Sequence, residues 1–148
     1  MDSFALLSAE MVSFDVKVRT KHLVEFTNFE AFMSSIKRET YKGYELLRLK
    51  GQFVGGDETD DLRKSFDTAT ANDLQVVIVD LEKVSYLNST ALGVLISGHT
   101  NFAKRNAKVV LCNLSDSIEN IFVVTKLTLV FSIFNSVDDA IANLDTAK

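Results

Sequence analysis

The sequence predicts a single α/β domain in which strands alternate with helices. Its 148 residues are typical of one domain and are enough to bury a core without disulfides or metal ions. The composition is 47% hydrophobic and 24% charged, which is typical of a folded chain and too apolar for a disordered one. From residue 57 onward, segments with helical spacing alternate with short apolar runs, the pattern of β-α units packed into a sheet.

The first part of the chain contains two predicted strands. Val12–Thr20 alternates apolar and charged or hydroxyl residues, which indicates a strand with one face in water. Residues 22–43 are predicted to be a helical insertion, because apolar residues between 29 and 36 recur at helical spacing. Tyr44–Lys50 reads as the second strand, and the Gly55–Gly56 pair follows it as a turn.

The remaining elements follow from changes in hydrophobic period. The β-branched run Val76–Val79 is typical of a strand that helices cover on both faces of a sheet. In order, we expect a helix over Asp57–Ala71, a strand from Val76, a helix over Ser89–Arg105, a strand over Lys108–Cys112, a helix over Ser115–Thr125, a strand over Thr128–Phe134 and a helix over Ser136–Leu144.

Charge and hydropathy exclude several classes of function. The net charge of −4 leaves no basic surplus to neutralise a phosphate backbone, so we expect no nucleic-acid partner. The chain begins without a cationic segment and has no apolar stretch of about 20 residues, so we expect a cytoplasmic protein with no membrane partner. Cys112 lies in an apolar run and is predicted to be a buried hydrophobe.

No catalytic, metal or cofactor site is predicted. His22 and His99 are far apart in sequence, and His99 is expected to be a partly buried structural residue. The glycines of residues 51–56 lack the spacing of a nucleotide-binding loop. The acidic residues of segment 57–61 lack the spacing of a calcium loop, and the positive end of a helix dipole explains them. No acid, base and nucleophile can be assembled, so the protein is not expected to be an enzyme.

One segment differs from the rest. Residues 76–96 read VVIVDLEKVSYLNSTALGVLI, which is a buried strand, a short connection, an Asn-Ser-Thr cluster and an apolar helix. Asn88 or Ser89 can cap the free amides of the first helical turn. A helix start also accommodates a phosphate, and a hydroxyl at that place can be exposed and open to modification.

These residues resemble a known family. The stretch DLEKVSYLNSTALG, from Asp80 to Gly93, is similar to the signature of STAS domains, especially the bacterial anti-sigma factor antagonists. The resemblance covers about residues 44–144, with residues 12–20 as the family's first strand and residues 22–43 as an insertion. It implies one STAS-like domain over residues 1–148, with a mixed sheet, an N-terminal strand pair and helices packed mainly on one face.

The resemblance also implies a function. The family's phosphorylated serine corresponds to Ser89, with Thr90 as the next hydroxyl. The expected partner is an anti-sigma factor that is also a serine kinase, bound when Ser89 is unmodified and released after phosphorylation, together with a cognate phosphatase. The residues expected to bind the partner are Asn88, Ser89, Thr90, Ala91, Gly55 and Gly56. Three positions depart from the family pattern: Asn88 replaces an aspartate, Ala91 a glycine and Val54 an acidic residue.

Two alternatives remain open. The chain can be a scaffold or sensory STAS module whose hydroxyls only cap a helix, or a STAS domain that binds a small ligand or nucleotide. The sequence also leaves open whether the protein is a monomer or a weak dimer.

Overall fold

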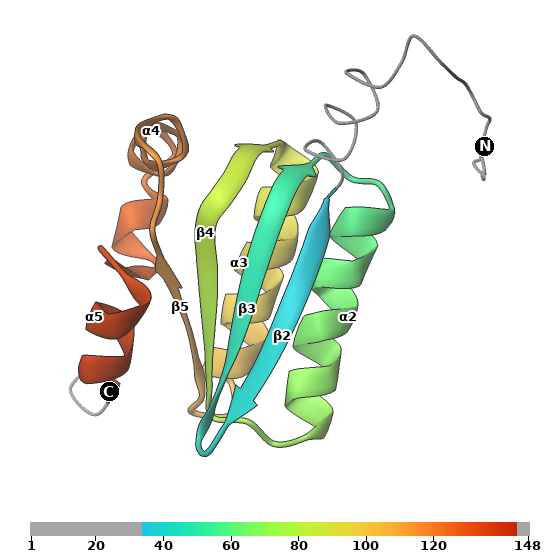
Figure 1. Cartoon of the computed structure of the whole chain (residues 1–148), viewed down its shortest axis with the longest axis vertical. Helices are drawn as coiled ribbons and strands as arrows, with labels where there is room; N and C mark the ends of the chain where they lie inside the picture. The colour runs from blue at the N-terminus through green and yellow to red at the C-terminus, as the bar shows by residue number, and fades with distance from the viewer. Residues whose placement is uncertain (1–33, 145–148) are drawn as a thin grey trace, which may run out of the picture. The chain divides into compact units, whose positions relative to one another are not determined.

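Five strands form one mixed sheet in the computed structural model, which describes residues 34–144 (Figure 1). The order across the sheet is β2-β3-β4-β5-β6. Strand β2 is antiparallel to β3, and each later strand is parallel to its neighbour. The strands are β2 Ser35–Tyr41, β3 Tyr44–Phe53, β4 Val76–Leu87, β5 Lys108–Cys112 and β6 Ser132–Phe134.

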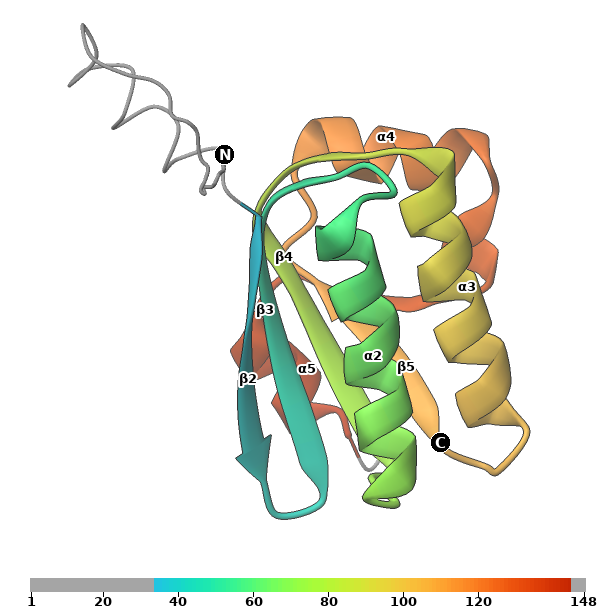
Figure 2. The ribbon, with the colours of Figure 1, turned by 90° about the vertical axis from the view of Figure 1, so that its right-hand side faces the viewer.

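Helices cover both faces of this sheet, but unequally. Helices α2 and α3 pack on one face, and α5 lies on the other (Figure 2). The larger buried cluster includes residues of α2, α3 and α4, whereas α5 contributes to a smaller cluster behind the sheet. The helices are α2 Asp57–Ala71, α3 Ser89–Ala103, α4 Asp116–Val124 and α5 Val137–Ala142. This arrangement confirms the predicted fold class, a mixed sheet with helices mainly on one face.

Helices α2 and α3 approach closely at one point. Gly98 of α3 lies against the ring of Phe66 in α2, where an added Cβ would be 3.0 Å from two ring carbons. The same ring meets Phe102 edge-on, with centroids 6.2 Å apart. Phe102 is fully buried, so Phe66 is held between two neighbours on α3.

The predicted helical insertion is wrong where it can be compared. Residues 35–41 of the expected insertion over 22–43 form strand β2, which joins β3 through the two-residue turn Lys42–Gly43. Gly43 has a φ of 92°, a value that suits glycine in a hairpin turn. Strand β2 is a mostly exposed edge, so its sequence lacks the apolar alternation that identifies a strand. The first predicted strand, Val12–Thr20, lies outside the described residues, and a single domain over 1–148 stays a prediction.

Two further boundaries differ from the prediction by more than three residues. Strand β4 continues to Leu87 instead of ending near Val79, because it stays paired with β3 through two register shifts. The strand expected over Thr128–Phe134 begins only at Ser132, and Leu127–Leu129 forms a 3-10 turn, η1. The helix Asp57–Ala71 and the strand Lys108–Cys112 have the predicted bounds.

Replacing Gly98 with alanine should lower the free energy of unfolding by about 1 kcal/mol, because the methyl would press on the confined Phe66 ring. Gly93→Ala, in the same helix, is the matched control. A Cβ at Gly93 meets nothing within 4 Å, so the better helix propensity of alanine should raise stability by about 0.5–1 kcal/mol. Urea denaturation measures both variants, and equal effects would contradict the close packing of α2 on α3.

Cys112 is buried, as predicted. Its burial makes the free energy of unfolding depend on pH in the alkaline range. Burial raises the pKa of its thiol from 9.0 to about 12. The thiol of the unfolded chain therefore ionises first, and the free energy of unfolding should fall by about 1.4 kcal/mol per pH unit between those two values. Cys112→Ala should lack this part of the alkaline loss in denaturation measured at a series of pH values. Parallel losses in the two proteins above pH 9 would refute the assignment.

Candidate functional site

The carboxyl ends of β3 and β4 form the edge where the predicted site lies. Phe53 and Leu87, the last residues of the two strands, are register partners. One residue further, the Asn88 amide donates a hydrogen bond to the Phe53 carbonyl at 3.0 Å. The chain then enters α3 directly, while residues 54–56 lead from β3 into α2. Both helices thus begin at this edge, the usual place for ligand and partner sites in α/β sheets.

Asn88 caps helix α3, as predicted. Its Oδ1 accepts a hydrogen bond from the Ala91 amide at 3.0 Å, and its carbonyl accepts from the Leu92 amide at 3.0 Å. The side chains of Ser89 and Thr90 are exposed. Within residues 34–144, the amides of Ser89 and Thr90 have no hydrogen-bond acceptor. The helix start therefore offers an accessible hydroxyl beside two free N–H groups.

The glycine loop after β3 lies against this helix start. A Cβ built on Gly55 would be 3.5 Å from the Thr90 Cβ and Cγ2, which is ordinary contact distance. Gly55 has a φ of 92°, a conformation that disfavours any residue with a side chain. A glycine here keeps the surface beside Thr90 open.

Two residues that the sequence analysis did not assign to the site hold this loop. The Glu58 carboxylate accepts hydrogen bonds from the amides of Val54 at 2.7 Å and Gly56 at 3.0 Å. The Thr59 hydroxyl accepts from the Gly55 amide at 2.9 Å and donates to Glu58 at 3.0 Å. Partial burial opposes ionisation of Glu58, but these hydrogen bonds together outweigh it and lower the pKa of the carboxyl.

Glu58 bears on one departure from the family pattern. The sequence has Val54 where the family has an acidic residue, yet Glu58 brings a carboxylate to the Val54 backbone from four residues further along. The sequence analysis explained Glu58 by the helix dipole alone. An acidic residue two positions after a glycine pair at a helix start is the signal that could have identified this contact.

Most of the predicted site residues come together, although the Ala91 side chain is buried. Gly55 contacts the position of Thr90, Gly56 lies in the same loop, and Asn88 and Ser89 begin α3. Ala91 is fully buried in the main core, so its side chain cannot contact a partner. The third residue of α3 turns back toward the sheet, so the partner-binding role predicted for Ala91 would be limited to its backbone and stays a prediction.

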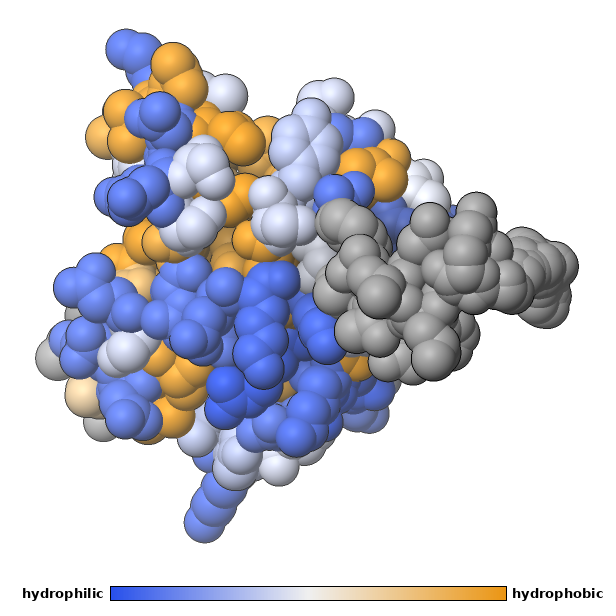
Figure 3. Space-filling model, turned by 45° about the horizontal axis from the view of Figure 1, so that its top comes forward, coloured by the Kyte–Doolittle hydropathy of each residue, from blue (hydrophilic) through white to orange (hydrophobic). Residues whose placement is uncertain are grey.

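Exposed apolar residues lie on α4 and η1, and α4 lies at the end of the molecule where α3 begins (Figure 2). Val124 of α4 is 76% exposed and Leu129 of η1 is 83% exposed. Val123 and Val130 are also exposed beside them. Figure 3 shows hydrophobic residues gathered over the lobe that carries α4. Soluble monomers rarely expose large clusters of apolar side chains, and such clusters often mark the surface that binds a partner.

The described part of the chain meets the requirements neither for a three-ligand metal site nor for a membrane-spanning helix. Residues 34–144 contain no group of three or more His, Cys, Asp or Glu side chains placed to hold a metal ion. None of their helices has the length and apolarity needed to cross a membrane. His99 is partly buried, with its ring 5.1 Å from that of Phe131, which confirms its expected structural place.

Relatives of known sequence match part of the chain. A segment of 60 residues is 37% identical to the anti-sigma-B factor antagonist of Listeria monocytogenes, and the same values hold for that of Listeria innocua. The match covers 40% of this chain and 53% of each relative. The chain thus spans about half the length of the curated relatives it matches.

Solved structures and a family model extend the likeness. The phosphorylated form of the Bacillus cell fate determinant SpoIIAA aligns with a TM-score of 0.62 at 17% identity, over 74% of this chain and 99% of that one. An anti-sigma factor antagonist from Mycobacterium paratuberculosis aligns with a TM-score of 0.69 at 17% identity, over 76% and 95%. The model of the STAS domain matches residues 9–140. The chain therefore belongs to the STAS domain family.

Proposed function

We propose that this protein is an anti-sigma factor antagonist that acts in the cytoplasm by binding rather than by catalysis. In its unphosphorylated form it binds an anti-sigma factor that is also a serine kinase, and so frees the sigma factor. Phosphorylation of Ser89 releases the partner, and a cognate phosphatase restores binding. The names of the Listeria relatives support the class of partner. The exposed Ser89 hydroxyl at the start of α3 is the observation that carries the proposal.

Phosphate transfer needs no catalytic group in this chain. The kinase moves the γ-phosphoryl group of ATP to Ser89 Oγ, the hydroxyl proton passes to a base of the kinase, and ADP leaves. The phosphoserine then carries about −1.5 to −2 charges at pH 7. The free amides of Ser89 and Thr90 and the positive end of the α3 dipole stabilise these charges in the free protein.

The same charges oppose binding of the partner. An interface of standard size buries about 800 Å² on each side. A neutral hydroxyl within it costs little to bury, because one hydrogen bond to the partner replaces its bond to water. A phosphoryl group covered by the partner loses its water, and burying it without a matched cation costs several kcal/mol. Because about 1.4 kcal/mol is tenfold in affinity, one modification separates the two proteins.

The exposed apolar residues of α4 and η1 give the interface its attractive part. Interface cores are depleted in charge and depend on a few well-packed apolar anchors. Helix α4, which ends at Val124, lies at the end of the molecule where α3 begins (Figure 2). Val124 and Leu129 are both mostly exposed in the free chain. A partner that covers Ser89 can also bury these side chains.

Variants of the two hydroxyl residues test the switch. Ser89→Ala should abolish phosphate incorporation by the kinase partner and keep its binding within about twofold, because a methyl group fits the same space. Ser89→Asp should weaken binding about tenfold or more, since it adds a fixed charge at the interface. Incorporation is measured with labelled ATP and affinity by titration calorimetry. Thr90→Ala is the matched control and should still be phosphorylated; labelling that persists in Ser89→Ala would overturn the assignment.

A charge placed on the apolar surface tests the interface separately. Val124→Asp should weaken partner binding at least about tenfold and leave the melting temperature nearly unchanged, because Val124 is 76% exposed. Thr70→Asp, on the exposed surface of α2 near its far end, adds the same charge away from Ser89. Calorimetry with the same partner should show unchanged affinity for Thr70→Asp. Unchanged affinity for Val124→Asp would remove α4 from the interface.

A further inference from the structure

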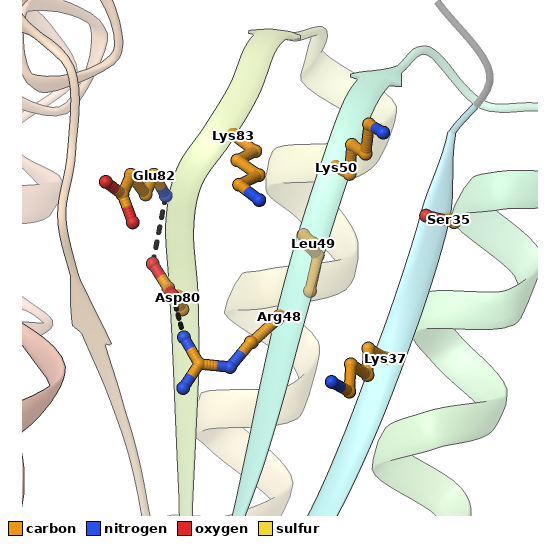
Figure 4. A pocket seen from close by; sticks show the side chains of 8 residues that line it. All are labelled: Ser35, Lys37, Arg48, Leu49, Lys50, Asp80, Glu82 and Lys83. Atoms are coloured by element: carbon orange, nitrogen blue, oxygen red, sulfur yellow. Dashed lines mark hydrogen bonds and ion pairs between the residues drawn. The ribbon is translucent and has the colours of Figure 1, made fainter. Parts of the chain in front are cut away.

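A hollow with an excess of positive charge lies on the sheet face opposite α2 and α3. Its volume is about 310 Å³, and its lining includes four cations and two carboxylates: Lys37, Arg48, Lys50, Lys83, Asp80 and Glu82 (Figure 4). The whole chain has a net charge of −4, so this local excess runs against the overall balance. Figure 3 shows hydrophilic residues gathered on this face, away from the apolar lobe at α4.

The strand register places two lysines opposite each other in this hollow, although the Lys50 side chain turns away from Lys83 in the free protein (Figure 4). Lys50 of β3 is the direct register partner of Lys83 of β4. Like charges directly opposite on neighbouring strands are destabilising. The pair before them is Arg48 with Asp80, so the chain advances two residues on β3 and three on β4. A regular register would place Glu82 opposite Lys50, which is an attractive pair.

The extra residue in β4 therefore exchanges an attractive pair for a repulsive one. Bulges often re-aim a side chain beside a functional site. Figure 4 shows Lys83 leaning toward β3, whereas Glu82 leans to the other side of β4. The bulge thus places a lysine, instead of Glu82, opposite Lys50, and it turns the Glu82 side chain toward the far rim of the hollow.

Nearby carboxylates do not neutralise these two lysines. Asp80 accepts hydrogen bonds from Arg48 through Oδ2, and from the Glu82 amide and the Asn113 side chain through Oδ1, each at 3.0 Å. The carboxylate of Asp80 is thus committed to Arg48 and to the bulge itself. Glu39 pairs with Lys37 and Arg48. Among residues 34–144, no ion pair includes Lys50 or Lys83.

We propose that this hollow binds a small ligand of the phosphate class, one that carries two or more adjacent negative charges. Lysine ammonium groups bind phosphate as mobile point charges, and an anion between Lys50 and Lys83 would turn their repulsion into two attractive contacts. The volume is at the lower end of the range for small-molecule pockets, which suits a phosphorylated small molecule. The site is separate from the proposed phosphorylation site, since Ser89 is not part of its lining.

Titration of the full chain with inorganic pyrophosphate tests the proposal. We expect saturable binding that weakens about tenfold in Lys50→Gln and in Lys83→Gln, because each variant removes from the hollow one positive charge that attracts the ligand. Lys64→Gln is the matched control, because Lys64 is an exposed lysine of α2 outside the hollow. Its affinity should stay within about twofold of the wild type. The absence of binding, or equal weakening in all three variants, would overturn the proposal.

Thermal melting gives a second readout that does not depend on binding heats. Without ligand, Lys83→Gln should melt above the wild type, because it removes the repulsion with Lys50, whereas Lys64→Gln should not. Pyrophosphate should then raise the melting temperature of the wild type more than that of Lys83→Gln. An oligoglutamate peptide that binds through Lys50 and Lys83 where pyrophosphate does not would assign the hollow to an acidic protein segment instead. Ser89→Ala should bind pyrophosphate normally, so failure here is distinguishable from failure of the phosphorylation switch.

Discussion

Parallel hydrogen bonding between β3 and β4 sets the register on which both proposed surfaces depend. The pairing of Phe53 with Leu87 brings the two strand ends together, so the glycine loop and the start of α3 meet at one edge. The same ladder pairs Lys50 with Lys83. Because side chains alternate between faces, a one-residue slip would send each side chain of the slipped segment to the opposite face. The buried residues Leu47 and Leu49 on the helix side oppose such a slip.

The start of α3, the proposed phosphorylation site, has fewer negative charges than the family pattern described above. The residue before Ser89 is asparagine, and the first turn of α3 contains no acidic residue. Asparagine and aspartate cap helices about equally well, so the structural role survives the exchange. The exchange removes a negative charge that would repel a phosphoryl group on Ser89. The favourable field of the helix start is therefore available to the phosphate undiminished.

The sequence predicted the elements that have a strong hydrophobic period and missed those that lack one. The β-branched run from Val76 and the stripe of α2 identify their elements because burial selects their residues. Strand β2 lies at the edge of the five described strands and consists mainly of charged and hydroxyl residues. Its conformation is therefore decided by its pairing with β3, which no local pattern reveals. The bulge in β4 was missed for the same reason. Its residues Leu81 and Glu82 read as an ordinary alternation, and only the register of β3 shows the extra residue.

The site was predictable to a similar extent. Asn88 and Ser89 follow a buried strand and precede an apolar helix, so capping and exposure could both be deduced from their positions. The burial of the Ala91 side chain was not predicted, because neighbours in a motif need not share a surface and the third position of α3 faces the core. Glu58 was missed for a different reason: its contacts are with backbone amides, and the signal for them in the sequence is its place two residues after the glycine pair, not its residue type.

Separation along β4 keeps the two proposed functions electrostatically independent. Lys83 and Asn88 are five residues apart on or just beyond one extended strand, roughly 16 Å at the usual rise per residue. That length is about twice the Debye length at physiological ionic strength, so an anion in the hollow and a phosphate on Ser89 interact weakly through solvent. Coupling between the two sites would therefore have to pass through the structure of the protein. It requires an element with two alternative conformations, and both the anion and the phosphate must shift the equilibrium between them. The bulge between Asp80 and Lys83 is the element of β4 best suited to this, because removing the bulge would place Glu82 opposite Lys50 without changing the pairing of Arg48 with Asp80.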